Sequence, residues 1–267
     1  MQILIIGGGN MGLTYAQSFV RSHITNKDSL MILTRSAGKA EELRQKNVAK
    51  IFTVAADCVS QADLIILAVK PQDSEILLSQ IKPFVHPQQV FLSIMAGIKV
   101  GNICNQLNIN KIVRAMPNLP SQIGMGMTTF ISSDEVTRLE LVMVQNLLST
   151  TGKTLYVENE ELIDASTAIS GSGPAYIYYV MEAFMNAAKT MGFNESQAEM
   201  LVNQTFNGAL DLYNKSDLSC TEWIGKVSSK GGTTEAAIKS FAGNELNINF
   251  EKGIFAAFER AKEIGKR

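Results

Sequence analysis

Three glycine-rich stretches, two of them also rich in hydroxyl groups, hold the residue types best suited to chemistry in this chain. They read "GGGNMG" (7–12), "SGSGPAY" (170–176) and "SSKGGTTEAA" (228–237). The chain has only two histidines, His23 and His86, and neither lies near a second plausible metal ligand in the sequence. We therefore expect no metal site, and chemistry that relies on backbone amides, hydroxyls and a bound cofactor.

The first stretch satisfies the pattern G-x-G-x-x-G, which is typical of dinucleotide binding when it follows a buried strand and opens a helix. Gly7 would allow the tight turn, Gly9 would let the backbone approach a pyrophosphate, and Gly12 would allow close packing of helix on strand. Asn10 and Met11, at the start of the helix, join the predicted cofactor contacts because unpaired N–H groups there attract an anion. The alternative is a glycine-rich turn in some other α/β protein.

The end of the second predicted strand indicates which dinucleotide is bound. An NAD site needs a carboxylate there for the ribose hydroxyls, whereas this chain has Thr34, Arg35 and Ser36. Arg35 can stack on adenine and pair with a 2′-phosphate, with both hydroxyls assisting. NADPH is therefore favoured, with NADH also open. The alternative is a solvated arginine at a strand end.

The stretch "AVKPQ" (68–72) leaves a strand that is predicted to lie beside the cofactor. Ala68 and Val69 end this strand, Lys70 would lie along the ribose or phosphates, and Pro71 would stiffen the turn. By itself the stretch is equally consistent with a plain end of a strand.

The other two stretches each place glycines before a helix. We expect Ser170–Gly173 to form a flexible loop, followed by a helix with Pro174 in its first position. In the other stretch Thr233 is predicted to cap a helix, with Glu235 in the first turn. A helix start that presents N–H groups suits a carboxylate. The alternative is that both stretches are simple helix caps.

The absence of histidine from the C-terminal third restricts the reaction. Reduction of a ketone needs a proton donor for the developing alkoxide. A protonated cyclic imine already carries its proton, so the protein mainly aligns the hydride donor and holds the substrate carboxylate. A site made of hydroxyls and amides fits that chemistry.

Two regions must position these residues. Strands are predicted at residues 2–6, 29–34, 63–69, 89–97, 111–117, 126–132 and 153–157, and helices after residue 9, at 37–46 and around Leu139–Leu147. Beyond residue 161 we expect four or five helical segments and no strand. The fold class is thus α/β, with a Rossmann-type dinucleotide-binding domain (1–160) followed by an all-α dimerisation domain (161–267). The helical region is so apolar for its size that part of it is expected to be covered by a second subunit.

Composition excludes several kinds of partner. The chain has 24 basic and 25 acidic residues and no basic run, which argues against nucleic acid. Its apolar N-terminal run is too short to span a membrane and lacks the features of a signal peptide. Cys58, Cys104 and Cys220 form no disulfide framework, which suits a reducing cytoplasm.

Taken together, five segments resemble the pyrroline-5-carboxylate reductase family over essentially the whole chain. They are "GGGNMG" (7–12), "AVKPQ" (68–72), "RAMPN" (114–118), "SGSGPAY" (170–176) and "VSSKGGTTEAAI" (227–238). The resemblance implies an NADPH-binding Rossmann domain, a helical domain that intertwines with that of a partner in a homodimer, and in many members a ring of dimers. It also implies the last step of proline synthesis, with an imino acid as substrate.

The resemblance also implies roles for single residues. The substrate carboxylate would be held by a set of amides and hydroxyls in one loop, at Ser229, Gly231, Gly232, Thr233 and Thr234. The nicotinamide side would be lined by Lys70, Pro71, Met95 and Ala96. Thr234 would hydrogen-bond near the ring nitrogen, and Thr167 would assist proton handling, together with Asp217. Thr167 and Thr234 are thus the predicted catalytic residues.

Departures and rival interpretations limit these expectations. Lys230 stands where the family usually has proline, Leu119 where it has threonine, and Met95 where alanine is common. These changes bear on affinity and on the range of cyclic imines, which stays open. A β-hydroxyacid dehydrogenase would need a lysine within 173–184, and none is present. A dinucleotide-sensing protein without catalysis would be expected to lack the intact "KGGTT" segment.

Overall fold

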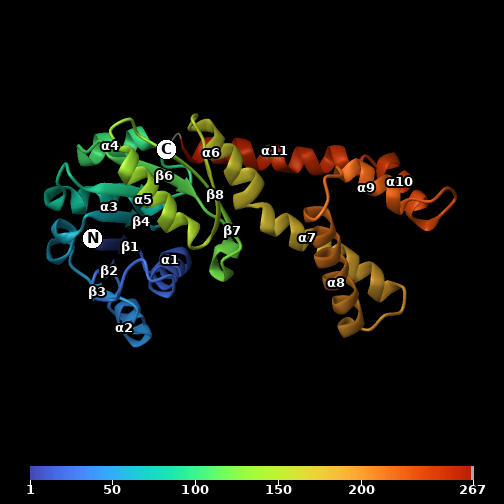
Figure 1. The fold of residues 1–267 in the computed structure, drawn as a ribbon, viewed down its shortest axis with the longest axis horizontal. Coiled ribbons are helices and arrows are strands. Elements are labelled where there is room, and N and C mark those ends of the chain that lie inside the picture. Colours follow the sequence, from blue (N-terminus) through green and yellow to red (C-terminus); the bar gives the residue numbers. More distant parts are fainter. Residues whose placement is uncertain (266–267) are drawn as a thin grey trace. The chain divides into compact units, whose positions relative to one another are not determined.

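The computed structural model describes residues 1–265, which form two compact units (Figure 1). The first unit comprises Met1–Ser172 and the described residues from Ala257 onward, and the second comprises Gly173–Ala256. The predicted division between residues 160 and 161 stays a prediction, and residues 266–267 of the predicted helical domain lie outside the described residues.

The first unit contains one eight-stranded sheet, of which the sequence predicted seven strands. The strands are β1 (Ile3–Ile6), β2 (Leu30–Leu33), β3 (Lys50–Phe52), β4 (Leu64–Leu67), β5 (Val90–Ser93), β6 (Ile112–Met116), β7 (Gly126–Ser132) and β8 (Gly152–Tyr156). Their order is β3-β2-β1-β4-β5-β6-β7-β8. Neighbouring strands are parallel except β6 and β7, which are antiparallel. The first six strands follow the order typical of dinucleotide-binding sheets, so the predicted fold class is confirmed.

The strands β1, β2 and β4 are continuous apolar runs, as expected where both faces of a sheet are covered. In β1, Ile3 and Ile5 join one core cluster, whereas Leu4 and Ile6 join a second cluster on the other side. This alternation follows from the two-residue period of a strand. The strand that the sequence analysis missed, β3, has only three residues and begins with the exposed Lys50, so it carries a weak apolar signal.

Six α-helices lie within the first unit. They are α1 (Asn10–Arg21), α2 (Ala37–Lys46), α3 (Ser74–Ile81), α4 (Val100–Leu107), α5 (Arg138–Ser149) and α6 (Glu161–Ser166). Residues of α1, α2 and α5 pack in the first core cluster, and residues of α3 and α4 pack in the second. The helices therefore cover the two faces of the sheet as separate groups. Neither α3 nor α4 was predicted, and each has only eight residues.

Shorter helical turns connect these elements. Single 3₁₀ turns are η1 (Ala55–Asp57), η2 (Val59–Gln61), η3 (Pro71–Asp73), η4 (Lys82–Phe84) and η5 (Leu119–Ile123), and a π-helical turn, η6, covers Thr167–Gly171. Of these, η3 and η6 contribute to the candidate site.

The second unit is helical, with α7 (Gly173–Thr190), α8 (Glu195–Asn214), α9 (Cys220–Val227), α10 (Thr233–Gly243) and the start of α11 (Leu246–Ile264). Beyond residue 161 the described residues thus form six α-helices, whereas four or five were predicted; only the η6 turn separates α6 from α7. As expected, no strand occurs among the described residues of this region. Capping boxes define the starts of α8 at Asn194 and of α9 at Ser219.

Candidate functional site

The glycines of the motif "GGGNMG" differ in how closely the surrounding backbone approaches them. Gly7 has a φ of +115°, and a Cβ added there would lie 2.5 Å from the carbonyl oxygen of Ala68. A Cβ at Gly12 would overlap the carbonyl oxygen of Gly7. A Cβ at Gly9 would meet nothing within 4 Å. Gly7 and Gly12 are therefore required by the fold, while the open side of Gly9 leaves room for a ligand to approach the backbone.

The first turn of α1 lies directly after Gly9 and keeps its N–H groups open. Gly9 is the N-cap residue and has no side chain to accept a hydrogen bond from the turn. Asn10 is exposed and Met11 is half-buried. Because the first N–H groups of a helix have no intrahelical acceptor and carry the positive end of its dipole, this turn favours an anionic group.

A cavity of about 490 Å³ lies at the carboxyl ends of β1, β2 and β4. Order along the sheet reverses between β1 and β4, and ligands of such sheets bind at this kind of position. The predicted cofactor residues that line it are Gly7, Gly9, Thr34, Arg35, Ala68, Val69 and Lys70. The predicted residues outside its lining are Asn10, Met11, Gly12, Ser36, Pro71, Met95 and Ala96. The first group therefore lines a single cavity.

Some residues outside the lining have local structural roles. Ser36 caps α2 and accepts a hydrogen bond from the Lys39 N–H at 3.3 Å. Met95 is 1% exposed, backbone included, and packs in the second core cluster. Its predicted contact with the cofactor stays a prediction.

The sequence analysis missed Gln72 and Asp73, which also line the cavity. Asp73 Oδ1 lies 3.2 Å from Arg35 Nη1, so the arginine proposed for the 2′-phosphate is already paired with a carboxylate. The one available signal was a carboxylate close after Lys70 at the end of a buried strand. Nothing in the sequence indicated that this segment approaches Arg35, which is 38 residues away along the chain.

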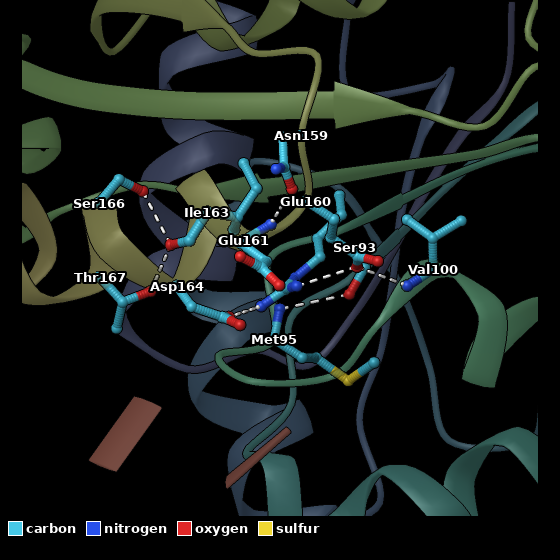
Figure 2. A network of polar contacts seen from close by, with 11 residues as sticks. Ser93, Met95, Val100, Asn159, Glu160, Glu161, Ile163, Asp164, Ser166 and Thr167 are labelled. Atoms are coloured by element: carbon cyan, nitrogen blue, oxygen red, sulfur yellow. Dashed lines mark hydrogen bonds and ion pairs between the residues drawn. The ribbon is translucent and has the colours of Figure 1, made fainter. Parts of the chain in front are cut away.

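A buried guanidinium ties three elements of the first unit together (Figure 2). Arg114 on β6 is 1% exposed, with Nη1 at 2.9 Å from Glu160 Oε1 and Nη2 at 2.6 Å from Asp164 Oδ1. The same Glu160 oxygen accepts the Val100 N–H, at the start of α4, at 2.9 Å. The network therefore joins β6, α6 and α4. An arginine inside the apolar run "KIVRAMP" was the signal for it, and the sequence analysis gave it no role.

Thr167, one of the two predicted catalytic residues, follows α6 directly (Figure 2). Its hydroxyl donates a hydrogen bond to the carbonyl oxygen of Ile163 at 2.8 Å, and its side chain is half-buried. With the proton engaged in this bond, the oxygen is left mainly as an acceptor. Asp217, its suggested helper, is exposed in the segment between α8 and α9.

The expectation of a flexible loop at Ser170–Gly173 is wrong. Residues Thr167–Gly171 form a π-helical turn, closed by the Ser172 N–H on the Thr167 carbonyl at 2.9 Å, and α7 begins at Gly173. Pro174, the second residue of α7, has no N–H to donate to the carbonyl four residues earlier, that of Ser170. Asn118 Nδ2 donates to that carbonyl instead, at 3.0 Å. A proline inside a nearly continuous helix thus accompanies a local widening.

In the second loop, Gly232 is the N-cap of α10 and Thr233 is its first residue, which corrects the predicted cap at Thr233. Gly231, with a φ of +75°, makes the turn before it. The Gly231 N–H donates to the Glu235 carboxylate, and the Gly232 N–H donates to the Ser229 carbonyl at 3.0 Å. The Glu235 carboxylate thus binds an N–H of the turn before the helix, and no side chain caps the first turn of α10 from the N-cap position.

Comparisons with known proteins agree along the entire chain. A protein-family model for pyrroline-5-carboxylate reductase dimerisation matches residues 160–264, and one described as NADP oxidoreductase, coenzyme F420-dependent, matches residues 2–97. The pyrroline-5-carboxylate reductase of Pseudomonas aeruginosa is 31% identical over 272 residues, which cover 100% of this chain and 97% of the relative. The chain belongs to the pyrroline-5-carboxylate reductase family.

Solved structures of other family members are similar over the same length. The pyrroline carboxylate reductase of Plasmodium falciparum, crystallised with NADP bound, has a TM-score of 0.90 and 27% identity, covering 99% of this chain and 98% of its own. The pyrroline-5-carboxylate reductase of Coxiella burnetii has a TM-score of 0.89 and 30% identity, covering 100% and 99%. Membership of this family decides against the β-hydroxyacid dehydrogenase interpretation.

The helical domain of this family member forms a dimer or larger oligomer, and its surface has the matching character. A groove of about 1110 Å³ is lined almost entirely by apolar side chains of α7, α8, α10, α11 and the connection between α7 and α8, among them Tyr179, Phe184, Phe193, Phe241 and Phe250. Phe184 and Phe241 are each 46% exposed. A single chain would leave this large apolar surface in water, which is unusual outside interfaces.

Among residues 1–265, no cluster of three or more His, Cys, Asp and Glu side chains that could hold a metal ion is found. No helix in that range is both long enough and apolar enough to cross a membrane.

Proposed function

We propose that this chain catalyses the NADPH-dependent reduction of 1-pyrroline-5-carboxylate to L-proline, the last step of proline biosynthesis. The observation that carries the proposal is the glycine cradle, the turn at residues 7–12 after β1, at the point where the order of the sheet reverses. A ligand can approach its backbone at Gly9, whereas the fold itself requires glycine at Gly7 and Gly12. Relatives that match the whole chain bear the name of this reductase, which supports the same reaction here.

The cofactor would be held by the cavity of the first unit. The backbone around Gly9 and the open turn of α1 suit the pyrophosphate, while Thr34, Arg35 and Ser36 suit a 2′-phosphate because no carboxylate follows β2 directly. Lys70 is exposed at the rim and would contact the ribose or phosphates. The nicotinamide side would be formed by Pro71, Met95 and Ala96, next to Lys70.

The substrate carboxylate would be held at the start of α10. Because the N–H groups of Gly231 and Gly232 are already engaged, those of Thr233 and Thr234 are the amides best placed to receive it, with the hydroxyls of Ser229 and both threonines. Lys230 is exposed beside these residues and would add a favourable charge.

The chemistry requires little of the side chains beyond alignment. When bound, NADPH supplies a hydride to the imine carbon and leaves as NADP⁺. The imine nitrogen arrives protonated and keeps its proton, so no histidine is needed. Thr234 would hydrogen-bond near that nitrogen. Thr167, whose proton is engaged by Ile163, would act as an acceptor that orients the ring N–H.

The site is proposed to work in an assembly and in the cytoplasm. Dimers formed through the helical domain would associate further into a ring in some conditions. The three free cysteines, Cys58, Cys104 and Cys220, suit a reducing compartment.

The deciding experiment is NADPH oxidation, followed by absorbance, with purified protein and DL-pyrroline-5-carboxylate, set beside pyruvate and a β-keto acid. Turnover with the imine alone is expected. Tight NADPH binding with no turnover of any of the three would overturn the proposal and favour a dinucleotide sensor. The Thr234→Val variant sharpens the result, because it should lower kcat/KM for the imine at least about tenfold while leaving the Kd for NADPH unchanged.

A further inference from the structure

The ion pair between Arg35 and Asp73 lies on the wall of the cofactor cavity and has no role in the scheme above. Arg35 follows β2, while Asp73 is the last residue of η3, which follows β4. Their side chains are joined by one contact, Nη1 to Oδ1, at 3.2 Å. The pair therefore bridges two strand ends at the mouth of the cavity.

The two partners differ in how firmly they are held. The side chain of Arg35 is 84% exposed, and Asp73 is its only recorded hydrogen-bonding partner among the described residues. The side chain of Asp73 is 33% exposed and its backbone is fixed, because its N–H donates to the Lys70 carbonyl at 2.9 Å. The next residue, Ser74, is buried and bonds the Pro71 carbonyl at 2.7 Å. Asp73 is thus the stationary partner.

The side chain of Asp73 does not cap the helix that follows it. It occupies the N-cap position of α3, where aspartate usually accepts a hydrogen bond from the first turn of the helix. Its side chain makes no such bond. The carboxylate instead pairs with Arg35 on the cavity wall.

A fixed carboxylate beside Arg35 should weaken binding of the phosphorylated nicotinamide cofactor but not of the unphosphorylated one. A 2′-phosphate carries close to two negative charges at neutral pH, so it would compete with Asp73 for Arg35 and be repelled by Asp73 itself. A cofactor with a free 2′-hydroxyl brings no such charge and leaves the ion pair intact. The pair thus opposes binding of the phosphorylated form selectively.

We propose that Asp73 is a specificity-determining residue that lowers the preference of this protein for NADPH over NADH. The inference rests on the proposed function, since it assumes that the cavity binds these dinucleotides. It adds that Arg35 alone would favour NADPH strongly and that Asp73 moderates this preference toward use of both cofactors.

The test measures the Kd of NADPH and of NADH by the fluorescence of the reduced nicotinamide, for the wild type and for Asp73→Asn. Removal of the charge should tighten NADPH binding about 3- to 10-fold and change NADH binding less than about 2-fold. The gain should shrink in 0.5 M salt, because exposed charges are screened there. The matched control is Glu75→Gln, which removes an equal charge from an exposed residue that does not line the cavity and should leave the ratio unchanged.

Three results would overturn the inference. One is unchanged binding of both cofactors in Asp73→Asn, and another is equal tightening for both, which would leave the ratio of the two constants as in the wild type. The third is weaker NADPH binding in the variant, which would make Asp73 a residue that orients Arg35 for the phosphate. If the wild type bound neither dinucleotide, the cofactor assignment in the proposed function would fall together with this inference, whereas the first three results leave that assignment intact.

Discussion

The two units of this protein bury their apolar residues in different ways. In the first unit, every residue of β1, β2, β4 and β5 is buried, and helices cover both faces of the sheet. In the second unit, Ala198 and Val202 are the only buried apolar residues among those described, while Phe184, Phe241 and many others are exposed. The sheet unit completes its core within one chain, and the helical unit needs another chain to complete one. Four predictions test this contrast, from the largest expected effect to the smallest.

The largest effect is expected where the first unit buries a charge. The Arg114→Met variant would leave Glu160 and the buried Asp164 without their partner, and we expect the free energy of unfolding to fall by about 3–5 kcal/mol. Urea denaturation measures this change. The control is Glu161→Gln, which removes an exposed carboxylate from α6, the helix that carries Asp164. It should change stability by less than about 0.5 kcal/mol. A loss below about 1 kcal/mol for Arg114→Met would show that the network is dispensable.

The next effect should appear in assembly of the second unit. A charge placed in the apolar groove by Phe241→Asp would be desolvated without a partner on association, at a cost of about 2–3 kcal/mol, so the dimer dissociation constant should rise about 30- to 150-fold. Sedimentation equilibrium measures it. Leu139→Asp changes a side chain that is 84% exposed in the first unit and should leave assembly unaltered. Equal dissociation constants for Phe241→Asp and wild type would contradict the assignment of this groove to the interface.

A smaller contrast separates two glycines of the same turn. Gly7→Ala must adopt a φ of +115° and approach the Ala68 carbonyl, so it should lower stability by about 1–3 kcal/mol. Gly9→Ala has open space around the new methyl group and should cost less than about 1 kcal/mol, while weakening NADPH binding at least about tenfold. Thermal unfolding and cofactor titration measure the two effects. Normal NADPH binding by Gly9→Ala would argue against the proposed cradle.

The smallest effect concerns the polar loop of the second unit. The Gly231 N–H, and next the Lys239 ammonium, hold the pKa of Glu235 below its ordinary value of 4.5. A lowered carboxyl pKa stabilises the folded loop above the ordinary value, and this contribution disappears as the pH falls through the folded pKa. The Gly231 amide resonance should therefore titrate with a midpoint below 4.5 in an NMR experiment, and the titration should vanish in Glu235→Gln. A midpoint above 4.5 would contradict the hydrogen bond.

Local patterns explain why much of the first unit could be predicted. The strand at 126–132 and the helix at 37–46 have the predicted bounds, since β-branched and aromatic residues favour a strand and a polar-faced run favours a helix within a few residues. The glycine roles also follow from local geometry, because a βα turn imposes the same steric demands wherever it occurs. The missed strand β3 is short and partly polar, so its position depends on pairing with β2 rather than on its own residues.

Two predictions were wrong at the starts of helices, one before α7 and one at α10. Pro174 and the preceding glycines predicted a loop, yet the chain continues through a π-helical turn because Asn118 satisfies the Ser170 carbonyl. At α10, Thr233 was expected to cap the helix, whereas Gly232 is the N-cap and the Glu235 side chain binds the Gly231 N–H of the preceding turn. In both places a side chain, that of Asn118 or Glu235, forms the hydrogen bond, and its position depends on how the backbone is folded.

By itself the sequence determined the α/β order of elements, the glycine cradle, the absence of a carboxylate after β2 and membership of a reductase family. Only the tertiary structure revealed that Asp73 pairs with Arg35 and that Arg114 is buried between Glu160 and Asp164. Periodicity and turn chemistry act over a few neighbouring residues and are therefore visible in the sequence. Ion pairs between residues about 40 or 50 positions apart depend on how strands are ordered in the sheet, and that order is set by packing of the whole unit.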